Sequence, residues 1–244
     1  MLRRGRKLRD NTSRSEDWRR DAGVKAVVLS NGPLGPAEFY LELIEEDDVL
    51  ICADGGANHA VALGLIPDFV VGDMDSIDTS VLAELSAQGR TELKRVPVEK
   101  DESDTELALD VAVDLAPSSI VLTCVLGARF DHALANVGLL ARVPAAIPAV
   151  IVEPEMSAFL VTDTVSIEGW PGRLVSLLPL FGEARGIDLE GFKYGLTSGV
   201  LSPGTTLGLS NVMLGETASV SVEEGALLAV LPDQAAPEPS LDLP

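Results

Sequence analysis

The chain has 244 residues, of which 46% are hydrophobic and only 4% are aromatic, and its formal net charge is -20. This length allows one large domain or two small ones, with a core built mainly of aliphatic side chains. The negative charge argues against a general nucleic-acid binder, which needs a basic surface to displace counterions. It does not argue against ATP, because a phosphate site is local and a metal ion can invert the charge there.

The two ends of the chain differ in composition from the rest. Residues 1–21 are rich in arginine, lack the apolar segment of a secretion signal, and are expected to form a disordered basic tail. Residues 235–244 are rich in proline and acidic residues and are expected to form a second disordered tail. The apolar runs between them are too short, or too broken by proline, to cross a membrane. Cys52 and Cys124 lie in apolar runs, so we expect buried, reduced thiols and a cytoplasmic protein.

From residue 24 onward, short apolar runs alternate with helical patterns. Strands are predicted at residues 24–29, 49–53, 69–71, 93–96, 120–125 and 150–152. Helices are predicted at residues 36–46, 57–64, 79–88, 103–115 and 131–142. The helix at 103–115 has the strongest signal, because Ser103 and Glu106 form a capping box ahead of apolar residues at helical spacing. The alternation predicts an α/β domain with a parallel sheet over residues 22–152, which binds its ligand beyond the carboxyl ends of the strands.

After residue 153 the pattern changes to short apolar runs separated by glycine and proline. Strands are predicted at residues 158–161, 164–167, 174–178, 218–222 and 226–231, without a convincing helix. Such spacing is typical of an antiparallel sandwich or barrel. We therefore expect a smaller all-β sandwich domain at residues 153–234.

Acidic residues at the ends of the predicted strands are the main functional signal. Asp54 follows the second strand, Asp73 and Asp75 follow the third, and Asp101 and Asp104 lie at the start of the next long helix. Any one of these aspartates is readily explained as a helix cap or turn residue. Five of them at successive strand ends are harder to explain in this way, and hard oxygen ligands suit Mg²⁺. If the backbone stays extended at 73–75, the side chains of Asp73 and Asp75 point the same way.

Basic residues lie near the same strand ends. Lys100 and Arg129 can supply positive charge to a polyanion, and Asp131 and His132 follow Arg129 directly. A divalent cation is needed in such a site because carboxylates and phosphates repel each other, and it can align a phosphoryl donor. The sequence contains no P-loop, no nucleophile elbow, no Gly-x-Gly-x-x-Gly after the first strand and no histidine pair at zinc spacing.

Taken together, these motifs resemble the thiamine pyrophosphokinase family. The resemblance runs through Ala-Asp-Gly-Gly-Ala-Asn at 53–58, Gly-Asp-Met-Asp-Ser at 72–76, Lys-Asp-Glu-Ser-Asp-Thr-Glu at 100–106, residues 127–132 with Asn136, residues 191–194, and Ser210-Asn211. Each motif is weak alone, but their order and spacing over residues 24–231 are specific. The chain has Ser103 where the family usually has threonine, and Leu-Ser-Asn-Val at 209–212 where it usually has Thr-Ser-Asn-Glu.

The resemblance implies an ATP-binding α/β domain, a thiamine-binding β-sandwich, and a homodimer with thiamine near the subunit interface. It implies the reaction of ATP and thiamine to AMP and thiamine diphosphate, with Mg²⁺ held by Asp73, Asp75 and Asp104 and with Asp101 beside them as a further catalytic acid. The nucleotide contacts that it implies are Asn31, Asp54, Gly55, Gly56, Asn58, Lys100, Arg129, Asp131 and His132. Ser210 and Asn211 are implied as the thiamine contacts.

Three other functions remain open at this point. The first is a pyrophosphokinase for another alcohol, such as a hydroxymethylpterin, and Ser210-Asn211 favours thiamine over that acceptor. The second is a non-catalytic nucleotide- or thiamine-binding protein, against which the full set of acids argues. The third is a metal-dependent phosphohydrolase, which predicts ATP breakdown without any acceptor.

Overall fold

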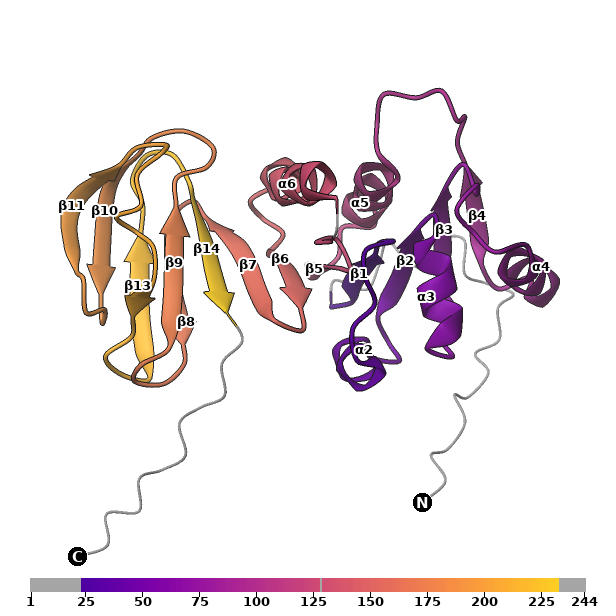
Figure 1. Ribbon diagram of the computed structural model, residues 1–244, viewed down its shortest axis with the longest axis horizontal. Coiled ribbons are helices and arrows are strands. Elements are labelled where there is room, and N and C mark those ends of the chain that lie inside the picture. The colour runs from indigo at the N-terminus through magenta and orange to yellow at the C-terminus, as the bar shows by residue number, and fades with distance from the viewer. Residues whose placement is uncertain (1–22, 128, 233–244) are drawn as a thin grey trace, which may run out of the picture. The chain divides into compact units, whose positions relative to one another are not determined.

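The computed structural model describes residues 23–127 and 129–232, and the chain divides into two compact units at Ile151 and Val152 (Figure 1). The expected tails at 1–21 and 235–244 lie outside the described residues. The first unit alternates strands and helices, whereas the described part of the second consists of strands and loops. The expected order, an α/β domain and then an all-β domain, is thus confirmed. None of the helices in the described ranges has the length and hydropathy needed to cross a bilayer.

The sheet of the first unit has six parallel strands in the order β6-β5-β1-β2-β3-β4. Its strands are β1 (Lys25–Leu29), β2 (Val49–Ala53), β3 (Phe69–Gly72), β4 (Glu92–Arg95), β5 (Ser119–Thr123) and β6 (Ala149–Glu153). The helices are α2 (Ala37–Leu43), α3 (Gly56–Ala62), α4 (Thr79–Gln88), α5 (Asp104–Asp114) and α6 (Phe130–Leu139), the last continued by the 3₁₀ turn η2 (Leu140–Arg142).

The central strands are continuous apolar runs because helices cover both faces of the sheet. Every residue of β2 and β3 is buried, whereas the edge strand β4 is partly exposed. Right-handed crossovers place α2, α3 and α4 on one face and α5 and α6 on the other. Consistent with this, α3 packs on β1 and β2, while α5 crosses β1, β2 and β3 and lies beside α6 (Figure 1).

The strand order of the sheet reverses direction between the neighbouring strands β1 and β5. From β1 the chain continues to β2, β3 and β4 on one side, and from β5 it continues to β6 on the other. The loops that follow these two strands diverge to opposite faces, which leaves a crevice at their carboxyl ends. The loops remain joined at their base, where Ser30 N–H donates to Thr123 O at 3.0 Å and Gly32 N–H to Cys124 O at 2.7 Å.

The start of α5 is fixed beside this crevice. Ser103 is the N-cap and its Oγ accepts a hydrogen bond from Glu106 N–H at 3.2 Å, which confirms this half of the predicted capping box. Thr105 Oγ1 lies 2.7 Å from Ser30 Oγ, a buried hydroxyl pair that joins α5 to the loop after β1. Asp104, the first residue of the helix, is therefore held at the carboxyl edge of the sheet.

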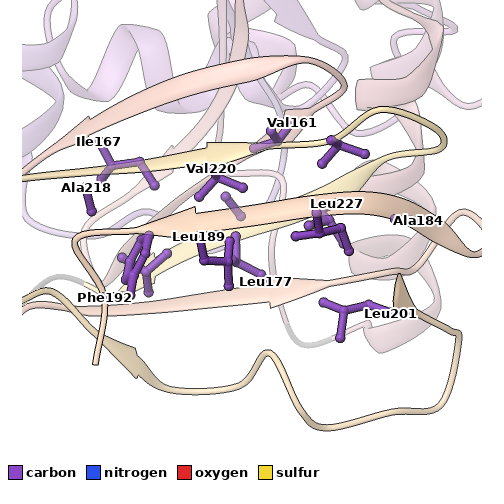
Figure 2. Close-up of a cluster of buried hydrophobic side chains, with 14 of the residues drawn as sticks. Val161, Ile167, Leu177, Ala184, Leu189, Phe192, Leu201, Ala218, Val220 and Leu227 are labelled. Atoms are coloured by element: carbon purple, nitrogen blue, oxygen red, sulfur yellow. The ribbon is translucent and has the colours of Figure 1, made fainter. Parts of the chain in front are cut away.

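The second unit has two sets of antiparallel strands, ordered β12-β9-β14-β7 and β11-β10-β13-β8. They are β7 (Met156–Val161), β8 (Thr164–Glu168), β9 (Leu174–Leu178), β10 (Ala184–Glu190), β11 (Leu196–Leu201), β12 (Asn211–Val212), β13 (Thr217–Ser221) and β14 (Leu227–Pro232). Val161, Leu177, Ile187 and Leu227 are fully buried in the apolar cluster drawn in Figure 2. This arrangement matches the expected β-sandwich.

Strands β10, β11 and β12 were not predicted from the sequence. β10 reads Ala-Arg-Gly-Ile-Asp-Leu-Glu, which lacks a continuous apolar run, and Gly186 within it has a φ of 60°. Its pairing with β11 contains register shifts, and β11 is itself largely exposed. β12 has only two residues. Short or irregular strands of this kind give little hydrophobic periodicity to detect.

Gly72 offers a test of how closely the loops pack at the carboxyl edge. It has a φ of 154°, and a Cβ at this position would lie 2.8 Å from the Cβ of Asp54. We expect Gly72→Ala to lower the free energy of unfolding by about 2 kcal/mol or more, because the backbone of Asp54 cannot easily move aside. Urea unfolding followed by circular dichroism measures this change.

Gly138→Ala is the matched control. This glycine lies in α6, where a Cβ meets no atom within 4 Å. Alanine there should leave stability unchanged or raise it by up to about 1 kcal/mol, because alanine favours helix. Equal losses of stability in the two variants would contradict a specific close contact at Gly72.

Candidate functional site

Loops from neighbouring parallel strands line a cavity of about 600 Å³ at the carboxyl edge of the first unit. The residues come from five segments: Ser30, Asn31, Gly32 and Pro33 after β1; Ala53 and Asp54 at β2; Asp73 and Ser76 after β3; Val98, Lys100, Glu102, Ser103, Asp104 and Thr105 before and within α5; Cys124, Val125, Gly127, Arg129, His132, Ala133 and Asn136 after β5. The cavity therefore includes the crevice between β1 and β5.

Three aspartates converge at this edge of the sheet. Asp54, Asp73 and Asp75 each offer a carboxylate oxygen, and these three oxygens lie within 4.8 Å of one another. Asp54 is only 4% exposed, whereas Asp75 faces solvent. Hard oxygen ligands at this spacing suit a small divalent cation that keeps part of its water shell.

A tight turn, and not an extended strand, brings Asp73 and Asp75 together. Met74 between them is buried and has a φ of 70°, so the backbone is left-handed at this point. Asp75 N–H donates to Asp73 Oδ1 at 3.1 Å, and Ser76 Oγ donates to Asp75 Oδ1 at 2.9 Å. The expectation that an extended backbone aligns the two side chains was wrong. The turn brings them together because its own hydrogen bonds fold the chain back.

Asp54 is the most buried of these acids and has one unpartnered oxygen. Its Oδ2 accepts a hydrogen bond from Ser76 N–H at 3.1 Å, while its Oδ1 is buried without a hydrogen-bond partner. Burial raises the pKa of Asp54; the hydrogen bonds from Ser76 oppose this rise, and the charges of Asp104 and Asp73 add to it. A buried, unpaired carboxylate oxygen is costly, and a bound cation supplies the missing partner. The donor set therefore fits a divalent metal ion.

Lys100 lies between two acids of the same edge. Its Nζ donates to Asp104 Oδ1 at 2.7 Å and lies 3.9 Å from Asp73 Oδ2, and only 12% of its side chain is exposed. Burial alone lowers the pKa of Lys100, but the hydrogen bond and charge of Asp104, together with the charges of Asp73 and Asp54, leave it raised. The side chain is therefore a charged ammonium.

Several predicted nucleotide contacts hold the loops in place. Asn58 Nδ2 donates to Ser76 O at 2.9 Å and its Oδ1 accepts from Asp78 N–H at 2.9 Å, so this side chain braces the turn after β3. A Cβ on Gly55 would overlap the side chain of Asn31, and one on Gly56 would overlap the carbonyl of Leu29. Gly56 is therefore required by its close approach to the backbone, whereas a side chain at position 55 would displace that of Asn31. Of these four residues, only Asn31 lines the cavity.

Arg129 and His132 line the cavity, whereas Asp131 is not among its lining residues. Arg129 Nε and Nη2 donate to the two carboxylate oxygens of Asp131 at 2.9 and 2.6 Å, and both side chains are exposed. This bidentate ion pair raises the pKa of Arg129 and lowers that of Asp131 well below its usual range, chiefly through the hydrogen bonds. A phosphate oxygen would have to compete with Asp131 for this guanidinium.

The structure does not gather every residue that the sequence pointed to. Asp101 is exposed and belongs neither to the cavity lining nor to the group of three acids. Asp104 lines the cavity but is bound to Lys100. Conversely, the sequence analysis did not single out Ser76 or the contact of Thr105 with Ser30, two residues 75 positions apart. No local pattern signals a contact over such a separation.

Ser210 and Asn211 belong to the second unit and differ in exposure. Ser210 is exposed with a φ of 53°, while Asn211 is 3% exposed. Asn211 Oδ1 accepts from Tyr194 N–H at 3.0 Å and from Val212 N–H at 2.9 Å, and its Nδ2 donates to Tyr194 O at 2.8 Å. The amide of Asn211 therefore ties two chain segments together.

A parallel α/β unit with an acidic cavity at its topological switch point, followed by an antiparallel sandwich, places the chain among the α/β proteins that bind ligands beyond the carboxyl ends of their strands. Two family models then match the chain in order. "Thiamin pyrophosphokinase, catalytic domain" matches residues 40–151, and "Thiamin pyrophosphokinase, vitamin B1 binding domain" matches residues 163–227. The chain belongs to the thiamine pyrophosphokinase family.

Individual relatives agree with this assignment. A thiamine pyrophosphokinase of Bacillus subtilis (strain 168) is 26% identical over 214 residues, which cover 83% of this chain and 96% of the relative. The crystal structure of thiamine pyrophosphokinase from Bacillus subtilis has a TM-score of 0.77 at 26% identity, covering 86% of this chain and 99% of that one. That from Geobacillus thermodenitrificans has a TM-score of 0.75 at 29% identity, covering 87% and 99%.

Asn211→Ala tests the bracing role of this amide. We expect the free energy of unfolding to fall by about 1–3 kcal/mol, because three hydrogen bonds are lost and the backbone groups of Tyr194 and Val212 lose their partner. Urea unfolding measures the change. Ser210→Ala, at the exposed neighbouring position, should stay within about 0.5 kcal/mol of the unmodified protein. Comparable losses in the free energy of unfolding in both variants would argue against a bracing role for the Asn211 amide.

Asp54→Asn tests whether burial of the carboxylate destabilises the metal-free protein. The pKa of Asp54 is raised in the folded state, so stability is lost as pH rises above the ordinary aspartate value of about 3.9. In EDTA at about pH 8 we expect Asp54→Asn to be the more stable protein, by on the order of 1 kcal/mol. This advantage should shrink as the pH falls towards about 4.

The control for this experiment is Asp114→Asn, an exposed site at the end of α5. It reports the effect of removing one negative charge from a strongly acidic protein. Urea unfolding of both variants is compared at the two pH values. A loss of stability in Asp54→Asn at about pH 8 would show that the buried charge is compensated without a metal ion.

Proposed function

We propose that this chain transfers the pyrophosphoryl group of ATP to the hydroxyl group of thiamine, giving thiamine diphosphate and AMP. The observation that carries the proposal is the group of Asp54, Asp73 and Asp75, of which Asp54 and Asp73 line the cavity, in a chain whose two units match the catalytic and vitamin B1 binding models in order. A cytoplasmic location is part of the same proposal, and the buried cysteines Cys52 and Cys124, which are not joined in a disulfide, support it.

Mg²⁺ is the proposed cofactor. Asp73 and Asp75 hold it, as the resemblance implies, and Asp54 joins them because its free Oδ1 needs a partner. When bound, Mg²⁺ supplies neutralisation of the phosphate charge and alignment of the donor. Asp104 is held by Lys100 and is left outside this ligand set in the nucleotide-free protein.

The residues of the cavity bind and orient the triphosphate. Lys100 and Arg129 supply positive charge, and the loop after β1, with Asn31, lies at the switch point where nucleotides bind in this class of sheet. The hydroxyl oxygen of thiamine forms a bond to the β-phosphorus as the bond from that phosphorus to the oxygen of AMP breaks. The hydroxyl proton leaves to solvent or to a base that we leave unassigned. Positioning and electrostatic stabilisation are sufficient for such a step.

Thiamine is proposed to contact the second unit. The vitamin B1 binding model spans residues 163–227, which include Ser210 and Asn211. Ser210 is the exposed residue of the pair, and Asn211 sets the position of Tyr194, a residue that is 57% exposed. In this proposal Ser210 touches the substrate and Asn211 positions its surroundings.

An assay of AMP and thiamine diphosphate tests the proposed reaction. The purified protein is incubated with ATP, Mg²⁺ and a panel of alcohols that includes thiamine and a hydroxymethylpterin. We expect one AMP and one thiamine diphosphate for each ATP consumed, and only with thiamine. AMP formed with the pterin would support the other kinase, phosphate release without an acceptor would indicate a phosphohydrolase, and no turnover would indicate a binding protein.

Asp73→Asn tests the proposed metal ligand. We expect turnover to fall at least about 100-fold, because the cation loses a charged ligand beside the triphosphate. The same variant should bind Mn²⁺ more weakly in a titration followed by electron paramagnetic resonance. Asp114→Asn, exposed and remote from the cavity, is the control and should keep normal turnover. An Asp73→Asn variant with near-normal turnover refutes the assignment.

A homodimer is the proposed working form. Several large apolar side chains of the second unit are exposed near the segment around Ser210: Tyr194 by 57%, Leu207 by 66%, Leu209 by 44% and Leu214 by 62%. A second copy of the chain covering them is consistent with the dimer that the family resemblance implies.

Sedimentation equilibrium tests the dimer. We expect a mass close to twice the 25.7 kDa of the chain. Leu214→Lys should shift the equilibrium towards the monomer, because a buried lysine without a partner opposes association. Leu41→Lys, at an exposed leucine of the first unit, should not. If the unmodified protein is monomeric and still makes thiamine diphosphate, the dimer is not required for the activity.

A further inference from the structure

Lys100 occupies an unusual place for a side chain next to a metal site. Its ammonium group pairs with Asp104 at 2.7 Å and lies 3.9 Å from Asp73, an acid that also belongs to the group around Asp54. Among the described residues, Lys100 is the basic side chain that forms ion pairs with Asp73 and Asp104. Because only 12% of its side chain is exposed, water screens its charge poorly.

A divalent metal ion and the ammonium group of Lys100 would compete for the carboxylate of Asp73. A divalent ion held by Asp73 would share this carboxylate with Lys100, whose Nζ lies 3.9 Å from Asp73 Oδ2. The two positive charges would then repel each other across a few ångströms in a partly dehydrated crevice, where such repulsion is strong. The ion alone should therefore bind weakly.

A triphosphate changes this balance. It brings several negative charges into the cavity, and Lys100 lines that cavity. The ammonium group can then turn to phosphate oxygens, which leaves Asp73 to the divalent ion and frees Asp104 to join it. Since a tight pair with Asp104 must break in this step, the nucleotide and the metal should bind with mutual reinforcement.

We propose that Lys100 acts as an internal counter-cation, which neutralises Asp73 and Asp104 in the empty site, weakens binding of the free metal ion, and couples metal binding to the arrival of the nucleotide. This inference rests on the proposed function for the identity of the nucleotide. It adds that Lys100 is a positioning residue that couples the binding of the metal ion to that of the nucleotide, in addition to being a phosphate contact.

The test is a titration with Mn²⁺ alone, followed by electron paramagnetic resonance, on the full chain without nucleotide. Lys100→Gln removes the charge and keeps a hydrogen-bond donor for Asp104. We expect it to bind Mn²⁺ at least about fivefold more tightly than the unmodified protein, the repulsion between one unit charge and a divalent ion about 8 Å apart even in a water-like dielectric. Lys100→Arg keeps the charge and should bind Mn²⁺ as weakly as the unmodified protein.

Lys94→Gln is the matched control. Lys94 lies on β4 and pairs with Glu92 at 2.8 Å, with 37% of its side chain exposed. It removes the same charge from the same unit but outside the cavity lining, so Mn²⁺ affinity should stay within about twofold. If Lys100→Gln does not fold, Lys100→Met is the second neutral variant and carries the same expectation.

A second readout addresses the coupling. In the unmodified protein a non-hydrolysable ATP analogue should tighten Mn²⁺ binding several-fold, and in Lys100→Gln this enhancement should be clearly smaller. Mn²⁺ binding that is unchanged or weaker in Lys100→Gln would overturn the inference. This outcome is independent of turnover. Tighter Mn²⁺ binding by Lys100→Gln, without thiamine diphosphate formation by the unmodified protein, would contradict the proposed function alone. Thiamine diphosphate formation without tighter Mn²⁺ binding would contradict this inference alone.

Discussion

Crowding of negative charge at one edge of a sheet is the constraint on which this structure depends. Asp54, Asp73, Asp75 and Asp104 come from three different junctions, and the fold places them at the same edge of the sheet. Backbone hydrogen bonds, a left-handed turn at Met74 and glycines without side chains make this possible. The repulsion that results is relieved only in part by Lys100, and that incomplete compensation makes the site receptive to further positive charge.

The architecture could be predicted from the sequence because its signals are local. The buried parallel strands are continuous apolar runs, and Ser103 is the cap that its sequence pattern suggests. Strands β10 and β11 were missed because polar and exposed residues interrupt their apolar pattern and the register between them is irregular. Their presence is decided by pairing with strands elsewhere, which no local pattern records.

For the site, the sequence identified the right residue types but not their partners. The motifs placed Asp54, Asp73 and Lys100 at strand ends, and the topology brings those ends into one cavity. What could not be predicted was how each side chain is engaged: Asp104 by Lys100, Asn58 by the turn at 76–78, and Asn211 by the backbone of Tyr194. The pairings of Asn58 and Asn211 join residues 17 to 20 positions apart. The pairing of Asp104 with Lys100 depends on how the loop before α5 folds back onto the helix.

The left-handed backbone at Asp54, Met74 and Cys124 has a consequence for heat resistance. Each of these residues has a positive φ without being glycine, and all three lie where strands enter the loops around the cavity. Strain and electrostatic repulsion are thus concentrated in one place, so this edge should be the first part of the first unit to open on warming. A ligand that gathers these loops would raise the melting temperature by mass action, and a thermal-shift screen of small phosphate compounds could find such ligands without knowledge of the reaction.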